Sequence, residues 1–183
     1  MKKYLILIIL LYPSLIMAQR FSISTNLIGY ANFGTLNLEA SYAVAQNWSI
    51  NASAKYNPFT FKEGDPKVQF QNRQKTFSIG TRYWPWHVYS DWWIGGRFQH
   101  QEYNTGGILF RRTEEGDRYG IGISAGYTLL VNKKFNIDFG LGCWGGLKEY
   151  TTYSCPLCGI VEKEDVSLFI MPNDILISLV YVF

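Results

Sequence analysis

The sequence is poor in charged residues. Asp, Glu, Lys and Arg together make up 17% of its 183 residues, against about 25% in an average soluble domain. Aromatic residues make up another 17% of the sequence, the same share as the charged residues. We find no basic stripe of the kind that nucleic-acid binding requires, so we expect no nucleic-acid partner. This composition favours β structure that faces an apolar environment.

The sequence also lacks long apolar runs, apart from one near its beginning. Residues 4–11 follow a basic start, and Ala18 is a small residue at the expected end of the segment, a pattern typical of a secretory signal peptide. The stretch is interrupted by Pro13 and is shorter than the ~20 residues that a membrane-spanning helix needs. We expect a signal peptide at 1–18 and a single β-barrel domain at 19–183. A membrane location would then depend on strands.

The hydrophobic period after Arg20 is two, which indicates strands rather than helices. The alternating segments have roughly the nine to eleven residues of a tilted membrane strand. The links between them alternate between short and long, as in an up-and-down barrel with both termini at one end. Eight segments can be counted, at about 21–29, 35–44, 48–56, 75–84, 92–99, 118–129, 135–143 and 174–183.

The bulk of the apolar side chains indicates which face of each strand points out of the barrel. A soluble barrel also alternates, but eight strands enclose an interior just wide enough for side chains to fill. The apolar faces are too bulky for that interior, so we expect them to point outward. The sequence therefore predicts an all-β fold: an eight-stranded antiparallel up-and-down transmembrane β-barrel with a side-chain-filled interior. A secreted soluble barrel or sandwich is the alternative.

The polar face combines glycine with long ionisable side chains. Glycine weakens a solvent-facing strand but makes room for an arginine in a narrow lumen. Buried charges must be paired to be tolerated. The sequence predicts a charge network inside the barrel, formed by Glu39, Lys55, Arg82, Arg97, Arg118 and Asp138.

The end of the chain carries a separate pattern. Apolar residues occupy every second position before a final aromatic residue, which resembles the signal that outer-membrane barrels present to their insertion machinery. Many β proteins also end in an apolar strand, and this is the alternative explanation. The positions are Ile175, Ile177, Leu179, Tyr181 and Phe183.

Cysteine and histidine are scarce, which limits the metal sites that the chain can form. Cys155 and Cys158 have the spacing of a zinc knuckle, but no second pair accompanies them. In an exported protein we expect a disulfide between them in an exposed loop, with Cys143 as a lipid-facing thiol. We therefore expect no metal and no cofactor.

Four tryptophans gather around the short link between the fourth and fifth segments. We interpret them as an aromatic girdle at the periplasmic membrane surface, with a sugar-binding platform as the alternative. They are Trp84, Trp86, Trp92 and Trp93.

The candidate for catalysis is His100, which shares a face with Glu102 near the outer end of the fifth segment. A lipid-modifying enzyme of the outer membrane would need a nucleophile within hydrogen-bond reach of such a histidine. We identify none, so we expect no enzyme. A narrow channel is a further alternative.

The ordered pieces of the sequence resemble an uncharacterised family of small Gram-negative outer-membrane proteins, grouped under a domain of unknown function and marked by a Cys-Pro-x-Cys-Gly element before the closing strand. The resemblance covers nearly the whole mature chain and implies an architecture, but no reaction. The chain departs from the pattern at Met171-Pro172-Asn173. The matching pieces are Ile23-Ser24-Thr25-Asn26-Leu27, Asn47-Trp48-Ser49-Ile50, Tyr56-Asn57-Pro58-Phe59, Arg82-Tyr83-Trp84, Gly126-Tyr127, Cys155-Pro156-Leu157-Cys158-Gly159 and Ile177-Ser178-Leu179-Val180-Tyr181-Val182-Phe183.

These observations lead to one functional hypothesis. We expect a structural or surface-interaction protein of the bacterial outer membrane, held in contact with outer-membrane lipid and lipopolysaccharide after assembly by the barrel-insertion machinery. Its ligand would bind to the long loops 57–74, 104–116 and 145–173.

Overall fold

The computed structural model describes residues 20–64, 69–108, 112–155, 157 and 159–183, without the side chains of residues 173 and 174. The predicted signal peptide at 1–18 and Cys158 lie outside the described residues. Within these ranges, no helix is long and apolar enough to cross a membrane.

The described chain is almost entirely β structure, as predicted. One short helix, α2 (Leu27–Ala31), follows the first strand. The strands are β1 (Phe21–Asn26), β2 (Leu36–Ala45), β3 (Trp48–Asn57), β4 (Thr60–Phe61), β5 (Phe70–Tyr83), β6 (Asp91–Gly106), β7 (Thr113–Leu130), β8 (Phe135–Tyr153) and β9 (Val161–Val182).

Eight strands close into an antiparallel ring. Consecutive strands pair from β1 to β3 and from β5 to β9, β3 pairs with β5, and β9 pairs back with β1. The two-residue β4 extends the edge of β5. The closing ladder between β1 and β9 is short, with five residue pairs from Ser22↔Val182 to Asn26↔Ser178. The predicted number of strands and their antiparallel order are therefore confirmed.

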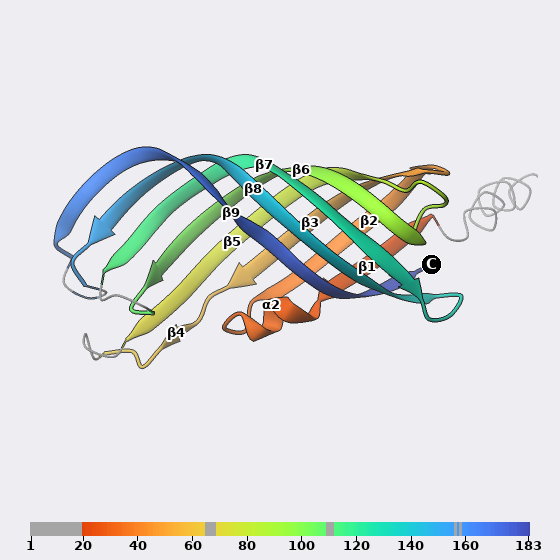
Figure 1. The fold of residues 1–183 in the computed structure, drawn as a ribbon. Coiled ribbons are helices and arrows are strands. Elements are labelled where there is room, and N and C mark those ends of the chain that lie inside the picture. Colours follow the sequence, from red (N-terminus) through yellow and green to blue (C-terminus); the bar gives the residue numbers. More distant parts are fainter. Residues whose placement is uncertain (1–19, 65–68, 109–111, 156, 158) are drawn as a thin grey trace, which may run out of the picture.

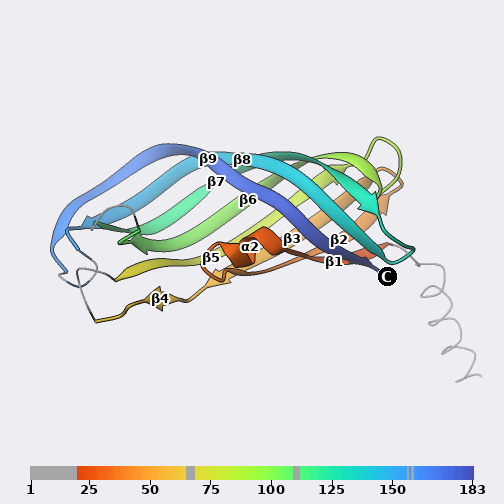
Figure 2. The same ribbon diagram turned by 60° about the horizontal axis from the view of Figure 1, so that its bottom comes forward.

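The two ends of the ring differ (Figures 1 and 2). At one end lie the C-terminus and the connections 46–47, 84–90 and 131–134. At the other end lie the described parts of the connections between β3 and β5, between β6 and β7 and between β8 and β9, which include residues 58–64, 107–108 and 159–160. We call the first the terminal end and the second the loop end.

The predicted orientation of the two faces is also observed. On β7, Ile121 and Ile123 are 72% and 68% exposed, whereas Thr128 on the other face is 1% exposed. Glycine makes room for arginine inside the ring: a Cβ on Gly95 would lie 3.1 Å from Cγ of Arg82. The side chains inside are mainly polar, and the bulky aliphatic ones cover the outside.

The sequence-based boundaries are wrong at the loop end. The predicted loops 57–74, 104–116 and 145–173 contain substantial parts of strands, because β5 to β9 continue well beyond the predicted segments. The extension of β7 carries polar side chains on both faces, so the hydrophobic alternation that marks a strand stops there before the strand does. The extension of β9 keeps an apolar outer row, in which Val166, Leu168 and Ile170 are 58%, 81% and 82% exposed. The first segment is shorter than predicted, since the chain turns into α2 after Asn26.

The tryptophan girdle is wrong for two of its four members. Trp86 and Trp92 are 60% and 58% exposed, but Trp84 and Trp93 are each 1% exposed and lie inside the ring. Trp84 Nε1 donates a hydrogen bond to Ser49 Oγ at 3.0 Å. Gly126 on β7 and Gly140 on β8 leave space for the indole of Trp93. The apolar core inside the terminal end, which we call the plug, consists of Ala43, Trp84, Val88, Tyr89, Trp93, Leu176, Val180 and Val182.

Candidate functional site

Arg82 is the centre of an ion-pair network inside the ring. Its Nη2 donates to Glu39 Oε1 at 2.6 Å and its Nη1 to Asp138 Oδ2 at 3.2 Å. Thr128 Oγ1 donates to the second oxygen of Asp138 at 2.6 Å, and the Trp93 ring lies 4.3 Å from the guanidinium carbon. All three charged side chains are largely shielded from solvent, with 15% exposure at most. Removing the charge of Arg82 would leave two buried carboxylates without this cation.

Lys55 and Arg97 lie next to this network. Together with Glu39 and Arg82 they line a small cavity of about 30 Å³. Five of the six residues predicted for the charge network are therefore brought together in the middle of the ring. The sixth, Arg118, belongs to a different group.

Arg118 forms a second cluster nearer the loop end. It donates from Nη1 to Gln101 Oε1 at 3.2 Å and lies 3.5 Å from Glu114 Oε1. Its guanidinium carbon sits 3.5 Å from the centre of the Tyr103 ring. Lys148 Nζ adds a 3.2 Å contact to Glu114. Sequence reasoning missed Glu114 and Lys148, because it placed both in loops.

A larger cavity of about 240 Å³ lies inside the ring beside the Arg118 cluster. We call it the amide cavity, because carboxamides dominate its lining. Two threonines, Lys55, Arg118 and Trp144 also border it. The carboxamides are those of Asn26, Asn32, Asn37, Asn72, Gln74, Gln99 and Gln101.

Hydrogen bonds hold several of these amides in fixed orientations. Gln101 Nε2 donates to Gln74 Oε1 at 2.6 Å, and Gln74 Nε2 donates to Thr35 Oγ1 at 3.3 Å. Since Arg118 donates to Gln101, a chain of polar contacts runs from the arginine across the cavity wall. Such ordered polar groups favour one ligand orientation over others.

Helix α2 forms one side of the amide cavity. Ile28 and Gly29 line the cavity, and the helix packs against β9 and β2. Asn26 joins these elements: its Oδ1 accepts from the backbone N–H of Ile28 at 3.1 Å and of Ile177 at 3.2 Å. The helix therefore occupies the space where a longer β1 would have continued the wall.

The outer face at the loop end carries His100 and Glu102, both on β6. His100 Nε2 lies 3.0 Å from Asp117 Oδ1 and its ring stacks on Tyr119 at 4.5 Å. Glu102 contacts Lys75 Nζ at 3.2 Å. Each of the two residues therefore has its charged partner on a neighbouring strand, β7 for His100 and β5 for Glu102.

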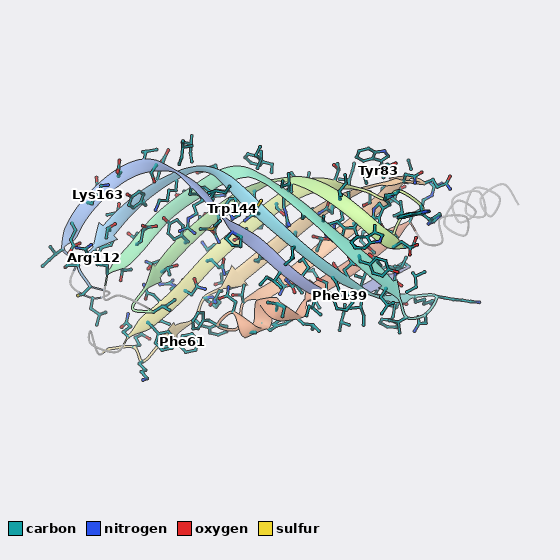
Figure 3. The ribbon with its side chains drawn as sticks, in the orientation of Figure 1. Phe61, Tyr83, Arg112, Phe139, Trp144 and Lys163 are labelled. Atoms are coloured by element: carbon teal, nitrogen blue, oxygen red, sulfur yellow. The ribbon has the colours of Figure 1, made fainter. Side chains whose placement is uncertain are left out.

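A broad outer groove of about 930 Å³ crosses the strands just beyond His100. Asp165 lies at its far end, and a hydrogen bond from Lys163 lowers the pKa of this carboxyl group. Figure 3 places Lys163 and Arg112 at the loop end, away from Tyr83 and Phe139. The carboxylates that line the groove are those of Glu102, Glu115, Asp117, Glu149, Glu164 and Asp165.

The cysteines are only partly described. Cys155 is disulfide-bonded and Cys143 is free and half-buried. The expected partner, Cys158, lies outside the described residues, so the pairing stays a prediction. Among the residues that the structure describes, no group of three or more His, Cys, Asp or Glu side chains could hold a metal ion.

The residues of the predicted C-terminal signal lie on the outer face of β9. Ile175, Leu179 and Phe183 are 58%, 45% and 52% exposed, and Ile177 and Tyr181 are half-buried. The four residues between them are buried inside the ring. The outer face of β9 thus forms one apolar stripe that ends in an aromatic ring.

Comparison with known proteins gives a family but no activity. No curated protein matches the chain. A family model described as a protein of unknown function, DUF3575, matches residues 4–183. This match agrees with the resemblance to an uncharacterised family, and because it spans almost the whole sequence, the chain belongs to the DUF3575 family.

Proposed function

We propose that the chain is an outer-membrane β-barrel that binds a ligand at its loop end and does not conduct. The observation that carries this proposal is the outer surface of the ring. It is covered by aliphatic and aromatic side chains, while the polar groups fill the inside. A soluble barrel has the opposite arrangement.

The height of the apolar surface fits a bilayer. On β7, the outward residues run from Leu129 to Tyr119 before the first outward carboxylate, Asp117. Ten residue steps of about 3.3 Å, at a strand tilt of about 40°, span roughly 25 Å along the barrel axis. This is the height of the apolar band in outer-membrane barrels.

Aromatic pairs mark the terminal end of this band. Trp48 packs on Tyr83 at 5.1 Å, and Trp92 packs on Tyr127 at 5.3 Å. Amphipathic rings prefer the level of the lipid headgroups. Short turns and both termini at this end are the usual arrangement on the periplasmic side, so the loop end would face the outside of the cell.

The arrangement of side chains inside the ring favours ligand binding over ion conduction. The plug closes the terminal end, and the Arg82 network lies across the middle of the ring. The amide cavity and the outer groove are found towards the loop end. A ligand reaching the protein from outside would therefore meet polar surfaces without a path to the periplasm.

The proposal has a direct test. A folded outer-membrane barrel in dodecyl sulfate should migrate faster on a gel before boiling than after it, and the protein should fractionate with the outer membrane. Planar bilayers containing the refolded protein should show no stable conductance steps. Fractionation with soluble periplasmic proteins would disprove the membrane assignment, and regular channel openings would disprove the closed interior.

A further inference from the structure

We infer that the amide cavity is a binding site for a single sugar ring, either free or as part of a glycolipid. The inference deepens the proposed function, on which it rests for the direction of entry from the outer side. The site shares Gln74 with the lining of the outer groove and Lys55 with the small cavity beside the Arg82 network.

The chemistry of the lining matches a neutral polyhydroxyl ligand. A carboxamide offers both donors and an acceptor, and so does each hydroxyl group of a sugar. Seven carboxamides line the cavity, and no Asp or Glu is among the described residues that do so. Arg118, one of the two cations, is already paired with Glu114. Metal ions prefer carboxylate or imidazole ligands, so this lining does not fit one.

The cavity also has an apolar side, which a sugar ring can use. Trp144 lines it and is 2% exposed, and its indole is held edge-on to Phe169 at 4.6 Å. Figure 3 shows Trp144 among the strands near the middle of the molecule. Met171 and Pro172 complete this side. A pyranose has C–H groups on its faces and hydroxyls at its edge, so it can contact both kinds of surface at once.

The volume limits the ligand to one ring. Drug-sized ligands occupy pockets of about 300–1,000 Å³, which exceeds the 240 Å³ found here. The space equals about eight water molecules at about 30 Å³ each. Sugar hydroxyls can replace such waters while keeping their hydrogen bonds.

Thr76 supplies a further polar group without an assigned partner. The residue is 1% exposed and borders the cavity, yet its Oγ1 has no hydrogen-bond partner among the described residues. The Thr76 hydroxyl is therefore a polar group of the lining for which a bound ligand would supply a partner. Buried hydroxyl groups of this kind usually have a partner.

Helix α2 forms the border of the cavity where β1 ends at Asn26 and the five-residue helix takes its place. On this side the cavity is bordered by Ile28 of the helix and by Pro172 and Ile175 of β9. Because these residues are apolar, this border suits the apolar part of a lipid-linked sugar, while the carboxamides suit the sugar ring of either source.

Saturation-transfer NMR on the refolded full-length protein tests this inference. The probes are free D-glucose, D-galactose and N-acetyl-D-glucosamine in one arm and lipopolysaccharide micelles in the other. Saturable transfer to the ring protons of any probe supports the site, and the arm that gives it identifies a free or a lipid-linked source. Absence of transfer in both arms, from protein that still shows heat-modifiable mobility, would overturn the inference and leave the barrel assignment intact.

Two variants locate the binding. Gln74→Leu removes an amide from the cavity wall, and Thr76→Val removes only the hydroxyl without a partner, so the second should fold even if the first does not. Each should weaken binding roughly tenfold, the equivalent of about one lost hydrogen bond. Gln46→Leu, the same chemical change at the terminal end, should bind as the wild type does. Unchanged binding by a folded Thr76→Val or Gln74→Leu protein would place the sugar elsewhere and refute the inference.

Discussion

Arg82 on β5 and Asp138 on β8 meet inside the ring at 3.2 Å, although 56 positions separate them in the sequence. The two carboxylate partners of Arg82, Glu39 and Asp138, lie on two other strands, β2 and β8. The ion pair therefore depends on closure of the ring, and it gives a sensitive measure of how well the interior is assembled.

Replacing Arg82 by Leu should strongly destabilise the protein. The change leaves the carboxylates of Glu39 and Asp138 close together without their cation, and breaking a buried ion pair costs about 3–5 kcal/mol. The measurement is urea unfolding of the protein in lipid vesicles. Lys75→Leu is the matched control, because Lys75 and Glu102 form an exposed pair (58% and 53%), worth about 0–1 kcal/mol. Equal losses for the two variants would contradict the buried network.

An arginine on the outer surface distinguishes a membrane barrel from a soluble one. Ile123, which is 68% exposed, lies near the middle of the apolar band on β7, and Ile123→Arg should lower the unfolding free energy in vesicles by about 2–4 kcal/mol. Glu149→Arg also changes an outward position, but beyond the apolar rows, and should change stability by about 1 kcal/mol or less. If Ile123→Arg is as stable as the control, the outer face does not contact lipid.

Removal of Phe183 should slow insertion into the membrane. The ring of Phe183 contacts Phe21 at 5.5 Å and Tyr181 at 4.8 Å, and its N–H donates to the Phe21 carbonyl at 2.9 Å. Phe183→Ala keeps that backbone bond and loses the ring, whereas deletion loses both. We expect both variants to accumulate unfolded protein in cells, measured as loss of the heat-modifiable form. Normal assembly of the deletion variant would refute the role of the terminal residue.

His100→Ala should leave the lipid A of the host unchanged. The side chain of His100 contacts an acidic partner, Asp117, and a stacked ring, Tyr119. Neither is an aliphatic hydroxyl or a thiol that could act as the nucleophile of an acyl transfer. Mass spectrometry of lipid A from cells with wild-type or variant protein makes the comparison. A lipid species that disappears with the variant would revive the enzyme hypothesis.

The strands and their orientation are predicted most accurately where one face of a strand is apolar. The outward rows through Ile121 and Ile123 follow a strict period of two, and there the orientation and the strand count are correct. Beyond Tyr119 both faces of β7 become polar, so periodicity no longer separates strand from loop. For this reason Glu114 and Lys148 were not expected to take part in the interior charge network.

The tryptophans show a second limit of sequence reasoning. Trp92 and Trp93 are adjacent on one strand, so alternation requires that one of them points inward. The density of tryptophans around the short link led us to place both residues in the girdle on the outside. The space comes from other strands: a Cβ at Gly126 would lie 2.5 Å from the Trp93 ring, and one at Gly140 would lie 3.0 Å from it. Only the register of β6, β7 and β8 shows that these two glycines lie next to Trp93.

The short ladder between β1 and β9 has a consequence for the order of assembly. Its partners lie at opposite ends of the chain, so joining them closes the longest loop that the protein contains, which carries the largest entropic cost of any strand pairing here. The β1–β9 ladder should therefore form last during folding, after β1 has paired with the nearby β2. Amide protons that are hydrogen-bonded across the β1–β9 ladder should also exchange with solvent deuterium sooner than those of the longer β7–β8 ladder.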